Sequence, residues 1–170
     1  MFRHLVPDER IGSVLDIDPA ALSARGIKGL ILDLDDTLVE QFEKAPDAGI
    51  CDWIARARER LGLVILSNNR RRSRVAPCAE TFGVPYVHLA LKPLLVGFRR
   101  AVRMLGVRPH EVAVVGDQLF TDVLGGKRLG AYTILVDPLS PERRLLRRLM
   151  RRAESAVLGR RRYGTSAGGF

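Results

Sequence analysis

Aspartates are concentrated in the segment KGLILDLDDTLVE, residues 28–40, where three of them fall within four positions directly after an apolar run. Carboxylates this close repel one another, and each raises the pKa of its neighbours unless a cation neutralises them. Four more residues able to do chemistry come later in the chain: Ser67, Lys92, Asp117 and Asp122. The carboxylates predict a site for a hard divalent cation, and oxygen-only ligands favour Mg²⁺ over zinc.

The strands that must position these residues are short. Five apolar runs predict them, and several runs are too continuously apolar for a sheet with one face in water, so we expect buried parallel strands. The runs are Leu30 to Leu32, Leu63 to Leu66, Val84 to His88, Val112 to Val115 and Tyr132 to Val136. Each reactive residue comes shortly after one of these runs, so we expect the carboxyl ends of the strands to bring the set to one crevice.

Segments with helical spacing separate the strands. The predicted helices are Pro46 to Arg60, part of Arg70 to Phe82, Pro93 to Leu105 and Thr121 to Leu129. We expect Pro93 at the first position of its helix and expect Pro77 to shorten or break the second helix. Gly125 and Gly126 are expected to mark a helix end. Alternating strands and helices predict an α/β fold, with a central parallel sheet and helices on both faces.

The reactive residues lie in four short motifs: DLDDT at 33–37, LSNN around Ser67, LKP around Lys92 and GDQLFTD at 116–122. In this order they resemble the motifs of the haloacid dehalogenase (HAD) superfamily of phosphatases, over about residues 27–137. The lead-in LVPDERIGSVLDID, together with GDQLFTD, is similar to the YqeG-type group of subfamily IIIA. The resemblance implies a HAD-like Rossmannoid three-layer sandwich. One departure is Asp36, where many members of the group have asparagine.

The resemblance also implies roles for residues of the site. Asp33 would be the nucleophile that forms an aspartyl-phosphate. Asp35 would protonate the leaving oxygen and then activate water. Thr37 and Ser67 would hydrogen-bond the motif turn and the phosphoryl oxygens, and Lys92 would offset negative charge.

The implied cofactor is Mg²⁺. Its ligands would be Asp33, the backbone carbonyl of Asp35, Asp117 and Asp122, the last acting directly or through water. Helix capping is an equally good interpretation of Asp122 taken alone. Ser67 with Asn68 can likewise be read as a helix N-cap pair, and a lone lysine such as Lys92 is most often solvated.

Spacing between the motifs bears on the substrate. Asp33 and Ser67 are 34 positions apart, and Ser67 and Lys92 are 25 apart, which leaves room for a helix and a strand but not for a cap domain. An uncapped site is open to solvent. Large or surface-bound substrates are therefore plausible.

Composition indicates one folded domain. The chain has 170 residues, 46% of them hydrophobic and 28% charged, and we expect a single capless domain over residues 1–139. Cys51 and Cys78 have no spacing that suggests a disulfide framework or a zinc site. The sequence shows no signal-peptide pattern and no apolar run long enough to span a bilayer, so a cytoplasmic location is expected.

Positive charge is concentrated near the end of the chain. Residues 143–162 contain nine arginines and one glutamate, which is +8 of a formal net charge of +9. Residues 140–162 are predicted to form a basic amphipathic helix, followed by a disordered tail at 163–170. Such a helix suits peripheral contact with an anionic membrane, and nucleic acid would attract the same arginines. A helix packed on the domain with a solvated polar face is the third interpretation.

Two functions follow from these features. The favoured one is Mg²⁺-dependent phosphomonoester hydrolysis through an aspartyl-phosphate. Phosphatidylglycerophosphate is a candidate substrate, because a mitochondrial phosphatidylglycerophosphate phosphatase is similar to the YqeG-type group. The alternative is a HAD-fold binding or scaffold protein that its Arg-rich tail recruits to RNA, the ribosome or another acidic partner.

Overall fold

The computed structural model describes residues 5–41, 43 and 45–140. Its strands form one six-stranded parallel sheet in the order β1-β6-β5-β2-β3-β4. The strands are β1 Glu9–Ile11, β2 Gly29–Leu32, β3 Gly62–Leu66, β4 Tyr86–Val87, β5 Val112–Gly116 and β6 Tyr132–Val136. The predicted α/β class with a central parallel sheet is confirmed.

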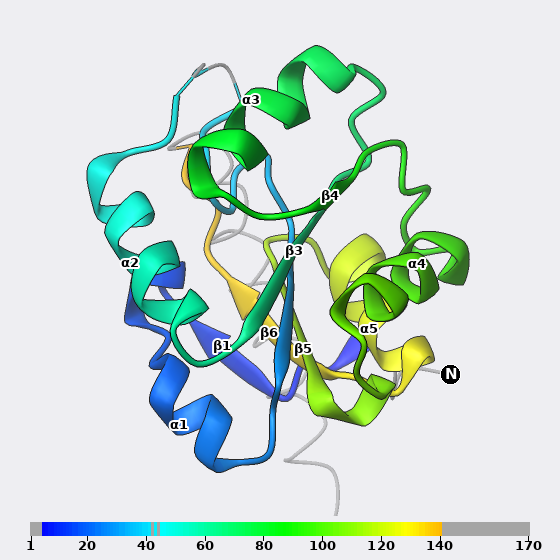
Figure 1. The fold of residues 1–170 in the computed structure, drawn as a ribbon. Coiled ribbons are helices and arrows are strands. Elements are labelled where there is room, and N and C mark those ends of the chain that lie inside the picture. The colour runs from blue at the N-terminus through cyan, green and yellow to red at the C-terminus, as the bar shows by residue number, and fades with distance from the viewer. Residues whose placement is uncertain (1–4, 42, 44, 141–170) are drawn as a thin grey trace, which may run out of the picture.

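Helices cover both faces of the sheet (Figure 1). They are α1 Pro19–Ala24, α2 Ala48–Arg58, α3 Arg72–Phe82, α4 Leu95–Leu105 and α5 Leu124–Leu129. Buried side chains of α1, α2 and α3 belong to one apolar core, and those of α4 belong to the other, which Leu129 of α5 packs against. The fold is therefore the predicted three-layer sandwich.

Side-chain alternation along β2 explains why the strands are continuous apolar runs in the sequence. Leu30 and Leu32 enter the core beneath α1, α2 and α3, whereas Ile31 enters the core beneath α4. Successive residues of a strand point to opposite faces, and here both faces are buried. Strand β2 consequently contains no position for a polar side chain until it ends at Asp33.

No cap domain is found in the part of the chain that the structure describes. The connection from β2 to β3 holds α2, and the connection from β3 to β4 holds α3. None of the described helices is long and apolar enough to cross a membrane. The predicted basic helix and terminal tail lie, from residue 141 onward, outside the described residues.

Two expectations about proline are wrong. Helix α3 runs unbroken for 11 residues with Pro77 inside it. Pro77 lies on the exposed side, while Val75, Ala79 and neighbouring apolar residues bury the other side, and this burial outweighs the lost backbone hydrogen bond. Helix α4 begins at Leu95, two residues after Pro93, because the Leu94 amide donates to the Leu91 carbonyl at 2.8 Å in a preceding turn.

The region after β5 also differs from expectation. Leu119–Val123 forms a π-helical turn, and α5 follows it directly. Gly125 and Gly126 lie inside α5 and do not end it, so the expected helix end is wrong. A Cβ atom on Gly125 would lie 2.2 Å from the Phe98 ring, and one on Gly126 would lie 2.7 Å from the Thr133 methyl group. These glycines allow α5 to approach α4 and the sheet closely.

The lead-in contributes elements that the sequence analysis did not predict. Strand β1 pairs with β6 at one side of the sheet, and α1 packs near α2. The predicted strand Val84 to His88 is reduced to β4, Tyr86–Val87. Short strands at the sides of a sheet have few neighbours, so their apolar pattern is weak or misleading.

Candidate active site

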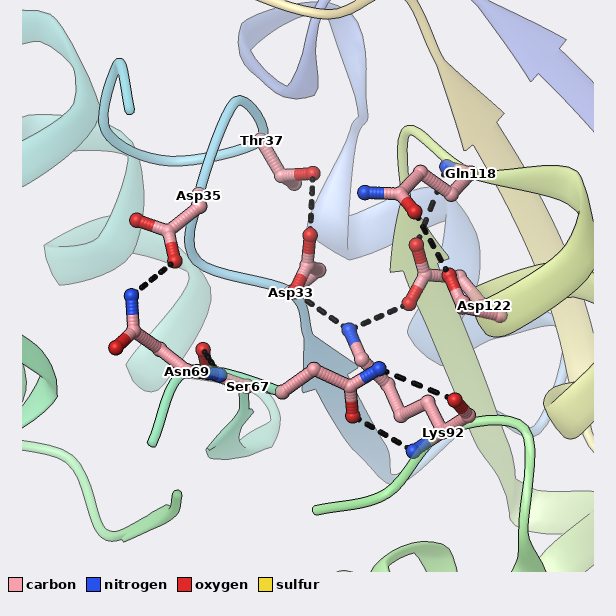
Figure 2. A network of polar contacts seen from close by, with 10 residues as sticks. Asp33, Asp35, Thr37, Ser67, Asn69, Lys92, Gln118 and Asp122 are labelled. Atoms are coloured by element: carbon pink, nitrogen blue, oxygen red, sulfur yellow. Dashed lines mark hydrogen bonds and ion pairs between the residues drawn. The ribbon is translucent and has the colours of Figure 1, made fainter. Parts of the chain in front are cut away.

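The centre of the site is an ammonium group between two carboxylates. Lys92 Nζ lies 2.5 Å from Asp33 Oδ1 and 2.6 Å from Asp122 Oδ1, and all three side chains are buried (Figure 2). Asp33 is the first residue after β2, and its amide donates to the Val115 carbonyl at 2.9 Å. The parallel sheet thus fixes the Asp33 backbone, as its position after an apolar run predicted.

Asp117 completes a cluster of three carboxylates. It is the first residue after β5, the strand that pairs with β2 at the centre of the sheet. One carboxylate oxygen from each of Asp33, Asp117 and Asp122 lies within 4.8 Å of the others. Three buried carboxylates at this spacing are a suitable ligand set for a hard divalent cation.

Asp122 has one carboxylate oxygen in the turn after β5 and the other in the middle of the site. Its Oδ2 accepts a hydrogen bond of 3.2 Å from the Gln118 amide at the start of the π-helical turn, as a capping carboxylate does. Its Oδ1 accepts from Lys92 in the middle of the site. One carboxylate therefore both stabilises the turn and contributes charge to the cluster.

Burial and the shared charge change the acidity of the site. Burial raises the pKa of Asp33 to about 7, with Asp122 and Asp117 adding to the rise and Lys92 opposing it. Burial would lower the pKa of Lys92, but the carboxylates of Asp122 and Asp33 outweigh it, so that pKa is raised. Lys92 accordingly remains an ammonium group, and the carboxylates of Asp33 and Asp122 share its positive charge.

Asp35 points away from this cluster. Its Oδ2 accepts a hydrogen bond of 3.2 Å from Asn69 Nδ2, and its Oδ1 accepts one of 2.9 Å from Arg74 Nε. Figure 2 shows the carboxyl group of Asp35 turned towards Asn69, while Asp33 faces Lys92. Thr37, in the same loop, is buried and its Oγ1 donates to Asp33 Oδ2 at 3.4 Å.

Arg74 is a polar neighbour of the site that the sequence analysis missed. It lies in α3, and its two terminal nitrogens donate to the carbonyl of Glu40, at 2.8 Å, and to that of Glu43. Arg74 therefore connects α3 to the loop after β2 as well as to Asp35. In the sequence it is one of four arginines among residues 70–74, and nothing in the spacing distinguishes it from the rest.

Ser67 is buried directly after β3, and its Oγ accepts from the Asn69 amide at 3.1 Å. Asn68 clamps the backbone of Lys92: its Oδ1 accepts from the Lys92 amide at 2.6 Å and its Nδ2 donates to the Lys92 carbonyl at 3.1 Å. The N-cap interpretation of this pair is wrong, because α3 begins at Arg72 with no side-chain cap. The solvated interpretation of Lys92 is wrong as well, since its side chain is buried.

Asp36 joins two distant parts of the chain. It is fully buried with φ at +64°, a left-handed conformation that aspartate tolerates better than most residues. The Leu139 amide donates to its carbonyl at 2.9 Å, and Ser140 Oγ donates to its Oδ1. The last described residues of the chain thus lie against the loop that contains Asp35.

Comparison with known proteins agrees with this geometry. A family model for HAD-hydrolase-like proteins matches residues 91–156. The chain is 38% identical over 157 residues to "Probable phosphatase YqeG" of Bacillus subtilis, covering 92% of this chain and 91% of that protein. The chain belongs to the YqeG-type group of HAD phosphatases. Membership of this family makes it an enzyme of the phosphatase class.

One more distant relative and one solved structure are also similar to this HAD phosphatase. The "Phosphatidylglycerophosphate phosphatase 1, chloroplastic/mitochondrial" of Arabidopsis thaliana is 26% identical over 168 residues, and the match covers 93% of this chain and 48% of that protein. The chain therefore spans about half the length of this plant relative. A HAD family enzyme from Bacteroides thetaiotaomicron, solved as a magnesium complex, has the same fold, with a TM-score of 0.53, 15% identity, and coverage of 72% and 99% of the two chains.

Proposed function

We propose that this HAD phosphatase hydrolyses a phosphomonoester with Mg²⁺ as cofactor, through a phosphorylated Asp33. The observation that supports this most strongly is the buried cluster of Asp33, Asp117 and Asp122 around Lys92. Burying three carboxylates costs folding free energy unless positive charge compensates for it, and a bound divalent cation would supply such charge.

The residues fit a Mg²⁺ ion. The donors are all oxygens, which this hard cation prefers. The pKa of Asp33, at about 7 with Lys92 as the nearby ammonium, indicates that the cluster has room for more positive charge. We propose Asp33, Asp117 and the backbone carbonyl of Asp35 as ligands, with Asp122 acting directly or through water. The ion, when bound, would neutralise charge on the phosphoryl oxygens and hold them in place.

In the first step, an oxygen of Asp33 attacks phosphorus and forms a new P–O bond. The bond from phosphorus to the leaving alcohol breaks, and the alcohol takes a proton from Asp35. In the second step, water gives its proton to Asp35 and attacks the same phosphorus. The bond to Asp33 breaks, which releases inorganic phosphate and restores both carboxyl groups.

Three other residues hold the phosphoryl group in this proposal. Lys92, fixed by Asn68 at its backbone and by Asp122 at its ammonium group, offsets the negative charge of the phosphoryl oxygens. The hydroxyl groups of Ser67 and Thr37 lie on loops after β3 and β2 and hydrogen-bond those oxygens or the turn beside them. Asp35 must rotate away from Asn69 and Arg74 to reach the leaving oxygen, because it now faces those two residues.

The proposed substrate is a lipid-linked phosphomonoester, with phosphatidylglycerophosphate as the example that the plant relative's name supplies. The open site favours a large substrate, since the described chain contains no cap domain. The nine arginines of residues 143–162 favour peripheral contact with anionic lipid. A HAD-fold scaffold recruited to RNA by the same arginines is the competing proposal.

A phosphatase screen of the purified full-length chain tests this function. It uses p-nitrophenyl phosphate and a set of lipid phosphates, each with Mg²⁺ and with EDTA. We expect phosphate release that requires Mg²⁺ and disappears in Asp33→Asn. A chain that releases no phosphate from any ester, yet binds RNA through its arginines, would support the scaffold instead.

A further inference from the structure

The rim of the site is unusually apolar. Four large hydrophobic side chains, on the loop around Lys92 and on the π-helical turn that contains Asp122, are exposed: Leu89 at 46%, Leu91 at 49%, Leu94 at 53% and Phe120 at 63%. We refer to these four residues as the apolar rim. Single exposed hydrophobic residues are ordinary on protein surfaces, but several gathered around one polar site indicate an interaction surface.

Contacts of the site fix the position of the apolar rim. Leu91 and Leu94 flank the Lys92–Pro93 pair, and Phe120 lies two residues before Asp122, the ion-pair partner of Lys92. The Leu89 amide donates to the Asn69 carbonyl at 3.0 Å. The loop follows β4 and the π-helical turn follows β5, so the rim lies at the carboxyl edge of the sheet, where the phosphoryl group is proposed to bind.

The fold itself does not require leucine at two of these positions. Leu89 has φ at +49° and Leu91 has φ at +56°, a left-handed conformation that a branched side chain adopts only with backbone strain. Glycine or asparagine would relieve that strain. Because these leucines are also half-exposed, core packing gives little compensation. Strain held at a functional edge is typical of residues that bind something.

The basic end of the chain starts from the same edge. Leu139 and Ser140 both donate hydrogen bonds to Asp36, in the loop after β2. The next 22 residues, 141–162, contain all nine arginines of the basic segment. The described chain therefore ends at the same edge of the sheet as the apolar rim.

We infer that this edge is a docking surface for an anionic lipid membrane, with the apolar rim entering the lipid interface. Exposed leucine and phenylalanine gain from leaving water at the boundary of the acyl chains, while arginines are attracted to anionic headgroups. RNA would also attract the arginines, but it would leave the three leucines exposed to water. The inference rests on the proposed function, since it explains how an uncapped site would reach a phosphomonoester carried by a lipid.

The test compares two double variants of the full-length chain. Leu94→Ser with Phe120→Ser removes half of the apolar rim, and serine suits the position of Leu94 as the N-cap of α4. Val6→Ser with Met104→Ser is the matched control, because these side chains are also exposed, at 62% and 42%. Val6 lies before β1 and Met104 lies in the last turn of α4, so both are at the amino edge of the sheet, away from the apolar rim. Each protein is sedimented with vesicles of phosphatidylcholine, with or without phosphatidylglycerol.

We expect the rim variant to bind the anionic vesicles about tenfold more weakly than wild type, equivalent to about 1.4 kcal/mol, while the control is unchanged. Equal binding by the two variants would overturn the inference. So would wild-type chain that binds single-stranded RNA but not anionic vesicles. The proposed function is measured separately, and both variants should hydrolyse p-nitrophenyl phosphate at the wild-type rate. If the wild-type chain does not hydrolyse this ester, the proposed function fails, but the vesicle comparison still tests the docking surface.

Depth of insertion gives a second measurement. Phe120→Trp and Met104→Trp each add one tryptophan to a chain whose own Trp53 is buried. Brominated lipids quench tryptophan only where it enters the acyl region. We expect quenching in Phe120→Trp and none beyond the wild-type signal in Met104→Trp. Equal quenching in both variants would show that the rim does not enter the membrane and would overturn the inference.

Discussion

Asp33 with Lys92 and Asp8 with Lys127 are the same pair of residue types at the same separation, 2.5 Å between nitrogen and oxygen. The first pair is buried at the carboxyl edge of the sheet, while the side chains of the second are 30% and 21% exposed beside β6. Burial raises the pKa of Asp33 to about 7. Partial burial acts in the same direction on Asp8, but hydrogen bonds from Lys127 and Thr133 outweigh it and lower the pKa.

The difference lies in how many donors each carboxylate has. Asp8 Oδ2 accepts from the amide and the hydroxyl of Thr133 at 2.7 and 2.9 Å, and its Oδ1 accepts from Lys127. Lys92, by contrast, divides one ammonium group between Asp33 and Asp122, with Asp117 nearby. Both carboxylate oxygens of Asp8 therefore accept hydrogen bonds, and these bonds stabilise the fold. In the Asp33 cluster one buried ammonium group is shared by two carboxylates, an arrangement that suits a site that binds a cation.

Replacing Asp33 tests the comparison most directly. Asp33→Asn should lower turnover of a phosphomonoester by about 10⁴-fold or more, because an amide keeps the shape of the side chain but cannot serve as the nucleophile. Steady-state kinetics with Mg²⁺ measure the loss, and circular dichroism checks that the fold is kept. Turnover at the wild-type rate would end the proposed mechanism.

Metal removal is the next largest effect. Hydrolysis should stop in excess EDTA and return when Mg²⁺ is added. Asp117→Ala should raise the Mg²⁺ concentration needed for half-maximal rate by at least about tenfold, since one ligand is lost. A titration of rate against Mg²⁺ measures this shift. Full activity in EDTA would contradict the proposed cofactor.

Arg74→Gln should have a smaller effect, about tenfold on kcat, because the loop that carries Asp35 loses the hydrogen bonds that tie it to α3 through the carbonyls of Glu40 and Glu43. Esters of alkyl alcohols should be affected more than p-nitrophenyl phosphate, whose leaving group needs little help from an acid. Arg72→Gln is the matched control on the same helix, since its Nε donates to the Tyr86 hydroxyl and not to Asp35. An equal decrease in kcat in both variants, or an equal decrease on both substrates, would show that Arg74 has no role in the mechanism.

Asp8→Asn should leave turnover unchanged and lower the free energy of unfolding by about 1–2 kcal/mol, since it weakens partly exposed hydrogen bonds to β6 and Lys127. The pKa of Asp8 is below its ordinary value of 3.8 in the folded protein. Its stabilising effect is therefore complete above pH 3.8 and is lost as the pH falls through the lowered folded value. Urea unfolding of wild type and variant should differ at neutral pH and converge in acid.

The sequence predicted the central strands and the residues at their ends well. Leu30 to Leu32 and Val112 to Val115 are continuous apolar runs because both faces of those strands are buried, and Asp33 and Asp117 follow them directly. A run that stops at a carboxylate marks a strand end with little ambiguity. The side strands lack this signal, so β1 was missed and β4 was predicted too long.

Contacts between distant segments could not be predicted from the sequence. Arg74 reaches Asp35 across 39 positions, and Asn68 holds Lys92 across 24. Neither residue type is unusual for its element, so only the three-dimensional arrangement shows what it contacts. The prediction that Gly125 ends a helix was wrong for a similar reason. A glycine that ends a helix and a glycine that allows close packing cannot be distinguished in the sequence, and only the position of Phe98 beside Gly125 shows which one it is.

The two ends of the described chain have different relations to the active site. Asp8 enters the sheet at its amino edge, where its amide donates to the Thr133 carbonyl at 3.0 Å, whereas Ser140 leaves beside Asp36 at the carboxyl edge. A protein immobilised through a residue beside Asp8 would present the catalytic face outward. A fusion partner joined just after residue 140 would instead stand over that face and restrict access to large substrates. The choice of attachment point can therefore determine whether an assay on a surface detects activity.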